Sequence, residues 1–176
     1  KGGLLSAQIL LNLDTEDDDE LTIGCAGGTD VTAEGSYNEI ALEDDHSCYK
    51  IVMKGLTGGH SGMDIQLGRG NANKLMNRFL YEMAGRVALH IHRIDGGGLR
   101  NAIPRESSAE VSVPARDEPT LQDMILNFNQ VLAAEFSTTD PEAILTAETI
   151  EATGPVLEPA FQAKLLKSIY ACPNGI

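Results

Sequence analysis

The sequence has little positive charge and no apolar run long enough to span a membrane. Its 176 residues contain 13 Lys and Arg against 26 Asp and Glu, which gives a formal net charge of -13. A field of this sign repels polyanions, so we expect neither nucleic acid nor a membrane surface as a partner. No apolar run reaches the roughly 18 residues of a spanning helix, and no secretory signal sequence is visible.

Cysteine is also scarce. Cys25, Cys48 and Cys172 are odd in number and widely spaced, and none belongs to a Cys-x-x-Cys pair. This pattern favours neither a disulfide framework nor a zinc ribbon, and a reducing cytoplasm suits it best. Apolar residues make up 42% of the chain, as in ordinary globular proteins, so the chain can bury a core.

The sequence has no initiator methionine. Lys1-Gly2-Gly3 leads directly into a short apolar run over 9–13, which is typical of a strand buried in a parallel sheet. Glycines at 24, 27 and 28 mark a crossing between regions, and the last residues follow a helical pattern without any closing element. We therefore expect a piece of a longer protein with a domain boundary near Gly27-Gly28.

From residue 48 onward the hydrophobic pattern predicts strand, helix, strand, strand, helix, strand. The strands are expected over 47–54, 86–94, 108–113 and 143–151, and the helices over 72–84 and 119–136. This order predicts an α+β fold, a ferredoxin-like two-layer sandwich with helices on one face of an antiparallel sheet. A further strand is expected over 29–37 and a third helix from Pro159, but the fold alone does not define an activity.

Two glycine-rich loops carry candidate site residues. In the first, Gly58, Gly59 and Gly62 let the chain turn sharply and leave the imidazole of His60 projecting from the bend. In the second, over 96–105, three glycines precede two arginines and Asn101, which can bind an anion or an amide. The alternatives are a tight turn with a solvated histidine and a plain hairpin connection, and the residues alone leave both open.

Metal ligation is a second possibility. His90 and His92 fall on one side of a predicted strand, about 7 Å apart, but no third ligand is near, so two solvated histidines on an exposed face are favoured. Asp14 stands at the carboxyl end of the run over 9–13, where metal or ligand contacts gather in open α/β sheets. The acidic run over 14–20 lacks the glycine and glutamate of a calcium loop and otherwise predicts a solvated turn.

Five motifs carry a resemblance to a known family. They are Asn12-Leu-Asp14-Thr-Glu16, Ile23-Gly-Cys-Ala-Gly-Gly28, Lys54-Gly-Leu-Thr-Gly-Gly-His60-Ser-Gly62, Gly70-Asn-Ala-Asn-Lys74 and Leu99-Arg-Asn101-Ala-Ile-Pro-Arg-Glu106. Together, in this order, they resemble the bacterial aminoacyl-histidine (Xaa-His) dipeptidases, cytosolic two-zinc exopeptidases related to carboxypeptidase G2 and the aminoacylases. The resemblance covers nearly all of the chain.

The resemblance implies that residues 1–27 are a stub of a zinc-binding catalytic domain. Residues 28–176 would then be the lid, or dimerisation, domain, incomplete at its C-terminus. Asp14 matches a metal ligand of the family. His60 matches a lid histidine that stabilises charge on the scissile carbonyl in the partner subunit, and Asn101 matches a substrate-binding asparagine.

Other parts of the family's active site are absent from this sequence. There is no His-x-Asp motif and no Glu-Glu pair, and the family's lid arginine would lie beyond residue 176. We expect a homodimer that hydrolyses dipeptides with two zinc ions in the intact enzyme, and no tight zinc binding or hydrolysis by this chain alone. The alternative is a non-catalytic ferredoxin-like module that binds a small molecule or dimerises.

Overall fold

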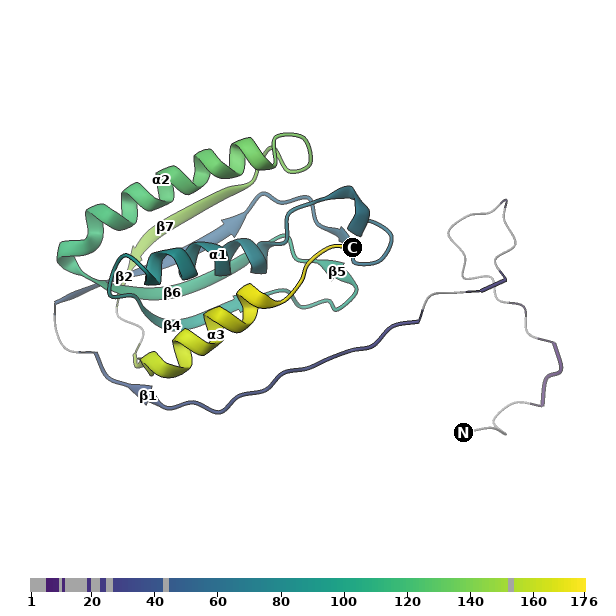
Figure 1. Ribbon diagram of the computed structural model, residues 1–176, viewed down its shortest axis with the longest axis horizontal. Coiled ribbons are helices and arrows are strands. Elements are labelled where there is room, and N and C mark those ends of the chain that lie inside the picture. The colour runs from purple at the N-terminus through teal and green to yellow at the C-terminus, as the bar shows by residue number, and fades with distance from the viewer. Residues whose placement is uncertain are drawn as a thin grey trace. The chain divides into compact units, whose positions relative to one another are not determined.

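The structure, a computed structural model, describes residues 6–9, 11, 19, 23–24, 27–42, 45–151 and 154–176 (Figure 1). The chain divides into two units, Lys1–Gly35 and Ser36–Ile176. All helices and strands of the described residues belong to the second unit. Asp14, Cys25 and most of the predicted strand over 9–13 lie outside the described residues. The domain boundary near Gly27-Gly28 stays a prediction.

The second unit is built on a four-stranded antiparallel sheet in the order β4-β6-β2-β7. The central pair is β2 (His46–Lys54) and β6 (Ser107–Pro114), flanked by β4 (His90–Gly96) and β7 (Ile144–Ile150). Alternate residues of β2 face the core, so Tyr49, Ile51 and Met53 are buried. A bulge between Ile91 and Arg93 shifts the register of β4 on β6.

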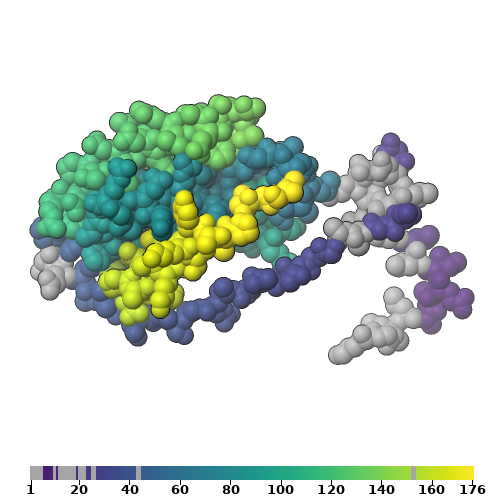
Figure 2. Space-filling model, in the orientation of Figure 1, coloured from purple at the N-terminus to yellow at the C-terminus, as the bar shows by residue number. Residues whose placement is uncertain are grey.

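Three helices cover one face of this sheet, side by side in Figures 1 and 2. They are α1 (Ala72–Ala84), α2 (Glu118–Glu135) and α3 (Pro159–Ala171). The predicted apolar stripe of α1 is buried against the sheet, and the Phe79 ring meets the Phe128 ring of α2 edge-on at 5.3 Å. Asn71 caps α1 by accepting hydrogen bonds from the N–H groups of Asn73 and Lys74. The predicted fold class is confirmed.

Short elements complete the unit. β1 (Glu39–Ile40) pairs with β8 (Val156–Leu157), and β3 (Gly59–His60) pairs with β5 (Ala102–Ile103). Single 3₁₀ turns lie at Ile65–Leu67 (η1) and Ala115–Asp117 (η2). Among the helices of the described residues, none is long and apolar enough to cross a membrane.

Two predicted strands differ from the structure. Residues 29–37 form no strand, because their side chains are exposed, Val31 to 87%, and among the described residues no strand pairs with them. The strand expected over 86–94 begins only at His90. Arg86 and Val87 instead donate their N–H groups to Met83 O, which continues the last turn of α1.

Candidate functional site

The two glycine-rich loops meet in the structure. β3 and β5 pair antiparallel, with His60 opposite Ala102, and Ser61 N donates to Asn101 O at 2.9 Å. His60 and Asn101, which stand 41 positions apart in the sequence, therefore lie at the same tip of the sheet. Both residues are exposed. The pairing brings together two of the three site residues expected from the sequence, and the third, Asp14, lies outside the described residues.

The imidazole of His60 is held by its own loop. Its Nδ1 accepts hydrogen bonds from Gly62 N and Met63 N, both at 3.1 Å. A ring nitrogen that accepts carries no hydrogen in the neutral ring, so these contacts assign the ring proton to Nε2. The exposed end of His60 is thus a hydrogen-bond donor.

An ion pair supports the backbone on both sides of Gly59. Asp64 Oδ2 accepts from His60 N at 2.7 Å and lies 3.4 Å from Arg69 Nη1, which in turn donates to Gly58 O at 2.7 Å. Gly59 has φ of 149°, and a Cβ there would lie 2.5 Å from Arg69 Nη1 and from Asp64 Oδ2. Glycine is favoured at this position, because L residues rarely adopt this φ and a side chain would also displace the ion pair.

Sequence reasoning missed Asp140, which closes the loop at its base. This carboxylate is 1% exposed and accepts from Thr57 N at 2.7 Å and Gly70 N at 2.8 Å. Burial alone would raise the pKa of Asp140, but the hydrogen bonds from Thr57 and Gly70 hold that pKa below its ordinary value. No sequence signal links Asp140 to His60, since the contact joins residues far apart along the chain.

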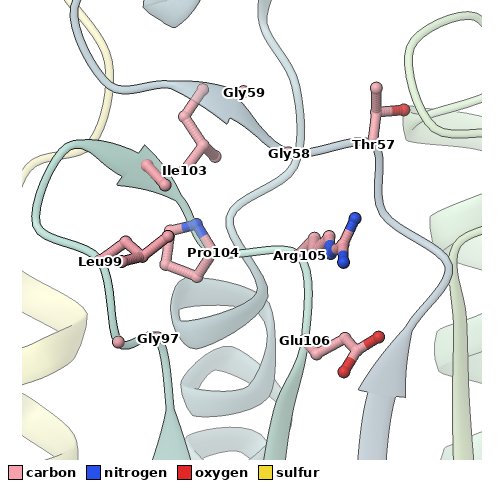
Figure 3. A pocket seen from close by; sticks show the side chains of 11 residues that line it. Thr57, Gly58, Gly59, Gly97, Leu99, Ile103, Pro104, Arg105 and Glu106 are labelled. Atoms are coloured by element: carbon pink, nitrogen blue, oxygen red, sulfur yellow. The ribbon is translucent and has the colours of Figure 1, made fainter.

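A pocket of about 400 Å³ opens beside the paired loops (Figure 3). Its lining residues are Thr57, Gly58, Gly59, Gly97, Gly98, Leu99, Ala102, Ile103, Pro104, Arg105 and Glu106. In Figure 3 the charged side chains of Arg105 and Glu106 point toward the segment that connects β2 to Thr57. His60 and Asn101 do not line this pocket but adjoin residues that do. The lining is mixed, with apolar Leu99, Ile103 and Pro104 beside charged Arg105 and Glu106.

The histidines of β4 differ from the solvated pair that the sequence favours. His92 bonds through Nε2 to Ser112 Oγ at 2.6 Å and through Nδ1 to Pro155 O at 3.1 Å. His90 packs edge-on against His46, with ring centroids 5.2 Å apart. Burial, and then the nearby His46 and His92, lower the pKa of His90. Both rings are partly buried, His90 against His46 and His92 between Ser112 and Pro155.

The described residues do not fit a zinc site. Among them, no group of three or more His, Cys, Asp or Glu side chains is placed to hold a metal ion. His92 already uses both ring nitrogens in hydrogen bonds, so it cannot ligate a metal without losing one of them.

Comparison with known proteins places the chain in a family. A family described as "Peptidase dimerisation domain" matches residues 51–140. The cytosol non-specific dipeptidase of Escherichia coli (strain K12) is 35% identical over 176 residues, which are 100% of this chain and 36% of that protein. The crystal structure of aminoacylhistidine dipeptidase from Vibrio alginolyticus is 35% identical with a TM-score of 0.77, covering 80% of this chain and 29% of that one. The chain thus spans only a part of these relatives, and it belongs to the peptidase dimerisation domain family.

Proposed function

We propose that this chain is the lid of a zinc-dependent dipeptidase that hydrolyses Xaa-His-type dipeptides in the cytoplasm. The observation that carries the proposal is the β3–β5 pairing, which brings His60 and Asn101 to one exposed tip. Both residues belong to the motifs that resemble the Xaa-His dipeptidases. The names of the Escherichia coli and Vibrio relatives support the substrate class, the peptidase activity and the compartment.

His60 would act on charge that develops during hydrolysis. Its Nε2–H is directed away from the loop by the two bonds at Nδ1, and a donor fixed in this way stabilises an oxyanion on the scissile carbonyl. Asn101 would hold the substrate through its amide. In the intact protein, zinc would activate the attacking water, and the general base and most metal ligands would come from residues outside this chain.

The domain arrangement is part of the same proposal. Residues 1–27 would be the stub of the catalytic domain, with Asp14 as one metal ligand, and residues 28–176 would be the lid. The lid would also hold two subunits together. β7 is an edge strand with no partner on its outer side among the described residues, so it offers unpaired backbone groups to a second copy.

The test uses the full-length protein loaded with zinc and an Xaa-His dipeptide. His60→Ala should lower kcat by about 100-fold or more, as loss of an oxyanion donor does, with a smaller effect on KM. Asn101→Ala should mainly raise KM. Gln66→Ala is the control: Gln66 is exposed on η1 close to the same loop, and its loss should leave both constants unchanged.

An inactive full-length protein would favour the non-catalytic module instead. An active protein in which His60→Ala retains full kcat would remove His60 from the chemistry.

A further inference from the structure

Asp140 is a buried carboxylate whose two oxygens bond the two ends of one loop. Oδ1 accepts from Thr57 N and Oδ2 from Gly70 N, and the residue is only 1% exposed. Among the described residues no Lys, Arg or His forms an ion pair with it. Only a carboxylate can accept at both terminal atoms, because an asparagine offers one oxygen and one donor nitrogen. The two hydrogen bonds therefore require a carboxylate at this position.

The two bonded amides are the ends of one segment, residues 57–70, which we call the His60 loop. Thr57 begins it and also lines the pocket, and Gly70 ends it just before the N-cap of α1. Thr57 Oγ1 adds a hydrogen bond to Thr139 O at 2.8 Å, next to Asp140 in the chain. Asp140 thus closes the loop at its base, while the Arg69–Asp64 pair supports it nearer the tip.

Besides Asp140, the His60 loop is held by the Arg69–Asp64 pair near its tip and by the β3–β5 pairing. Its strand β3 is two residues long, and glycines at 58, 59, 62, 68 and 70 give its backbone wide freedom. A loop of this kind samples many conformations unless its ends are held. Holding both ends with one carboxylate limits where His60 can lie relative to the rigid sheet and to α2.

We propose that Asp140 is a positioning residue for His60: by fixing both ends of the His60 loop to the connection between α2 and β7, it sets where His60 Nε2 meets the substrate carbonyl. The inference rests on the function proposed above. Because misplacement of a catalytic group by about 1 Å can cost 100-fold in rate, loss of one end of the loop should be visible in kcat.

The first measurement is a double-mutant cycle in the full-length, zinc-loaded enzyme. Asp140→Asn should lower kcat by about 10-fold or more and change KM little, because His60 acts on the transition state. In the His60→Ala background, Asp140→Asn should lower kcat no further, since there is no imidazole left to misplace. Asp140→Glu keeps two acceptor oxygens and should recover part of the lost kcat.

The matched control is Glu142→Gln. It removes the same charge from an exposed side chain that stands two positions after Asp140. It should leave kcat unchanged in both backgrounds. A purely structural role for Asp140 predicts a different pattern: Asp140→Asn would lower kcat by the same factor with and without His60. That outcome, or a folded Asp140→Asn enzyme with the parental kcat, would overturn the inference.

A second measurement covers the case in which Asp140→Asn fails to fold. In proton–nitrogen NMR spectra, the amide signals of Thr57 and Gly70 should titrate together in acid, and in the His60→Ala variant, which has no imidazole to titrate, the Gly62 and Met63 amides should move with them. Thr57 and Gly70 signals that do not respond to acid until the protein unfolds would contradict the inference. If His60→Ala itself leaves kcat unchanged, the proposed function fails instead, and the two failures are distinguished.

Discussion

The loop that carries His60 determines which of its ring nitrogens is the hydrogen-bond donor. The N–H groups of Gly62 and Met63 occupy Nδ1, so the neutral ring presents Nε2–H to anything that approaches the tip. A general base would need an unprotonated nitrogen facing the substrate. The local hydrogen bonds therefore suit His60 to stabilise negative charge and not to remove a proton from water.

The lowered pKa of Asp140 predicts how the stability of the fold depends on pH. Its pKa in the folded protein is lowered from the ordinary value, because the hydrogen bonds from Thr57 and Gly70 outweigh burial. A carboxyl group with a depressed folded pKa stabilises the fold above its unfolded pKa of about 3.9, and that contribution is lost as the pH falls through the folded pKa. Asp140→Asn should therefore lower the free energy of unfolding by about 1–3 kcal/mol at pH 7, because one backbone N–H loses its acceptor.

The measurement is urea unfolding of the wild type and of Asp140→Asn at neutral pH and below the folded pKa. The difference between the two proteins should shrink in acid, because protonated Asp140 also loses one acceptor. An equal difference at both pH values would show that the charge of Asp140 does not contribute.

The longer elements follow from the sequence pattern, and the short ones do not. The helix over 72–84 was predictable because apolar residues recur at spacings of three and four after an asparagine cap. β3 and β5 contain two residues each, which is too few for an alternating pattern to register. The motifs indicated His60 and Asn101 individually, but only the tertiary fold shows that the two loops carrying them pair through β3 and β5.

The errors of the sequence-based predictions also arise from tertiary contacts that the sequence pattern does not show. The segment over 29–37 contains residues that favour strands, yet a strand needs a partner and a buried face, and neither can be read from nine residues. Asp140 could not be found for a related reason. A single aspartate after a helix is usually a solvated residue, and the role of Asp140 depends on the two ends of one loop, which lie 70 and 83 positions away.

At the scale of elements, the α1–α2 contact predicts the cost of losing an aromatic side chain. Phe79 is fully buried and meets Phe128 edge-on at 5.3 Å. Phe79→Ala should lower the free energy of unfolding by about 3–5 kcal/mol, from lost transfer energy and the cavity left behind. Glu82→Ala, on the exposed side of the same helix, removes only a 3.6 Å contact with Arg78 and should cost less than about 0.5 kcal/mol.

Urea unfolding of both variants, analysed with the same m-value, measures how much each one lowers the free energy of unfolding. Equal losses for Phe79→Ala and Glu82→Ala would mean that α1 does not carry the core contact.

For the whole molecule, the proposed function divides one active site between two subunits. Asp14 would ligate metal in the catalytic domain of one subunit, and His60 would reach that site from the lid of its partner. Full-length Asp14→Ala and His60→Ala homodimers should each be nearly inactive, the first because a metal ligand is lost and the second because about 3 kcal/mol of charge stabilisation is lost.

Mixing the two inactive proteins tests the division between subunits. After random exchange of equal amounts, about half of the dimers contain one subunit of each kind, as the two-fold symmetry of the assembly requires. In each mixed dimer, the subunit that kept Asp14 receives His60 from the partner that lost Asp14, so one of its two sites is complete. About a quarter of all sites should then recover activity, whereas the same mixture held before exchange should stay inactive. If His60 acts within its own subunit, every site lacks one of the two residues, and activity that stays at the parental level after exchange verified by native mass spectrometry rules out the trans role.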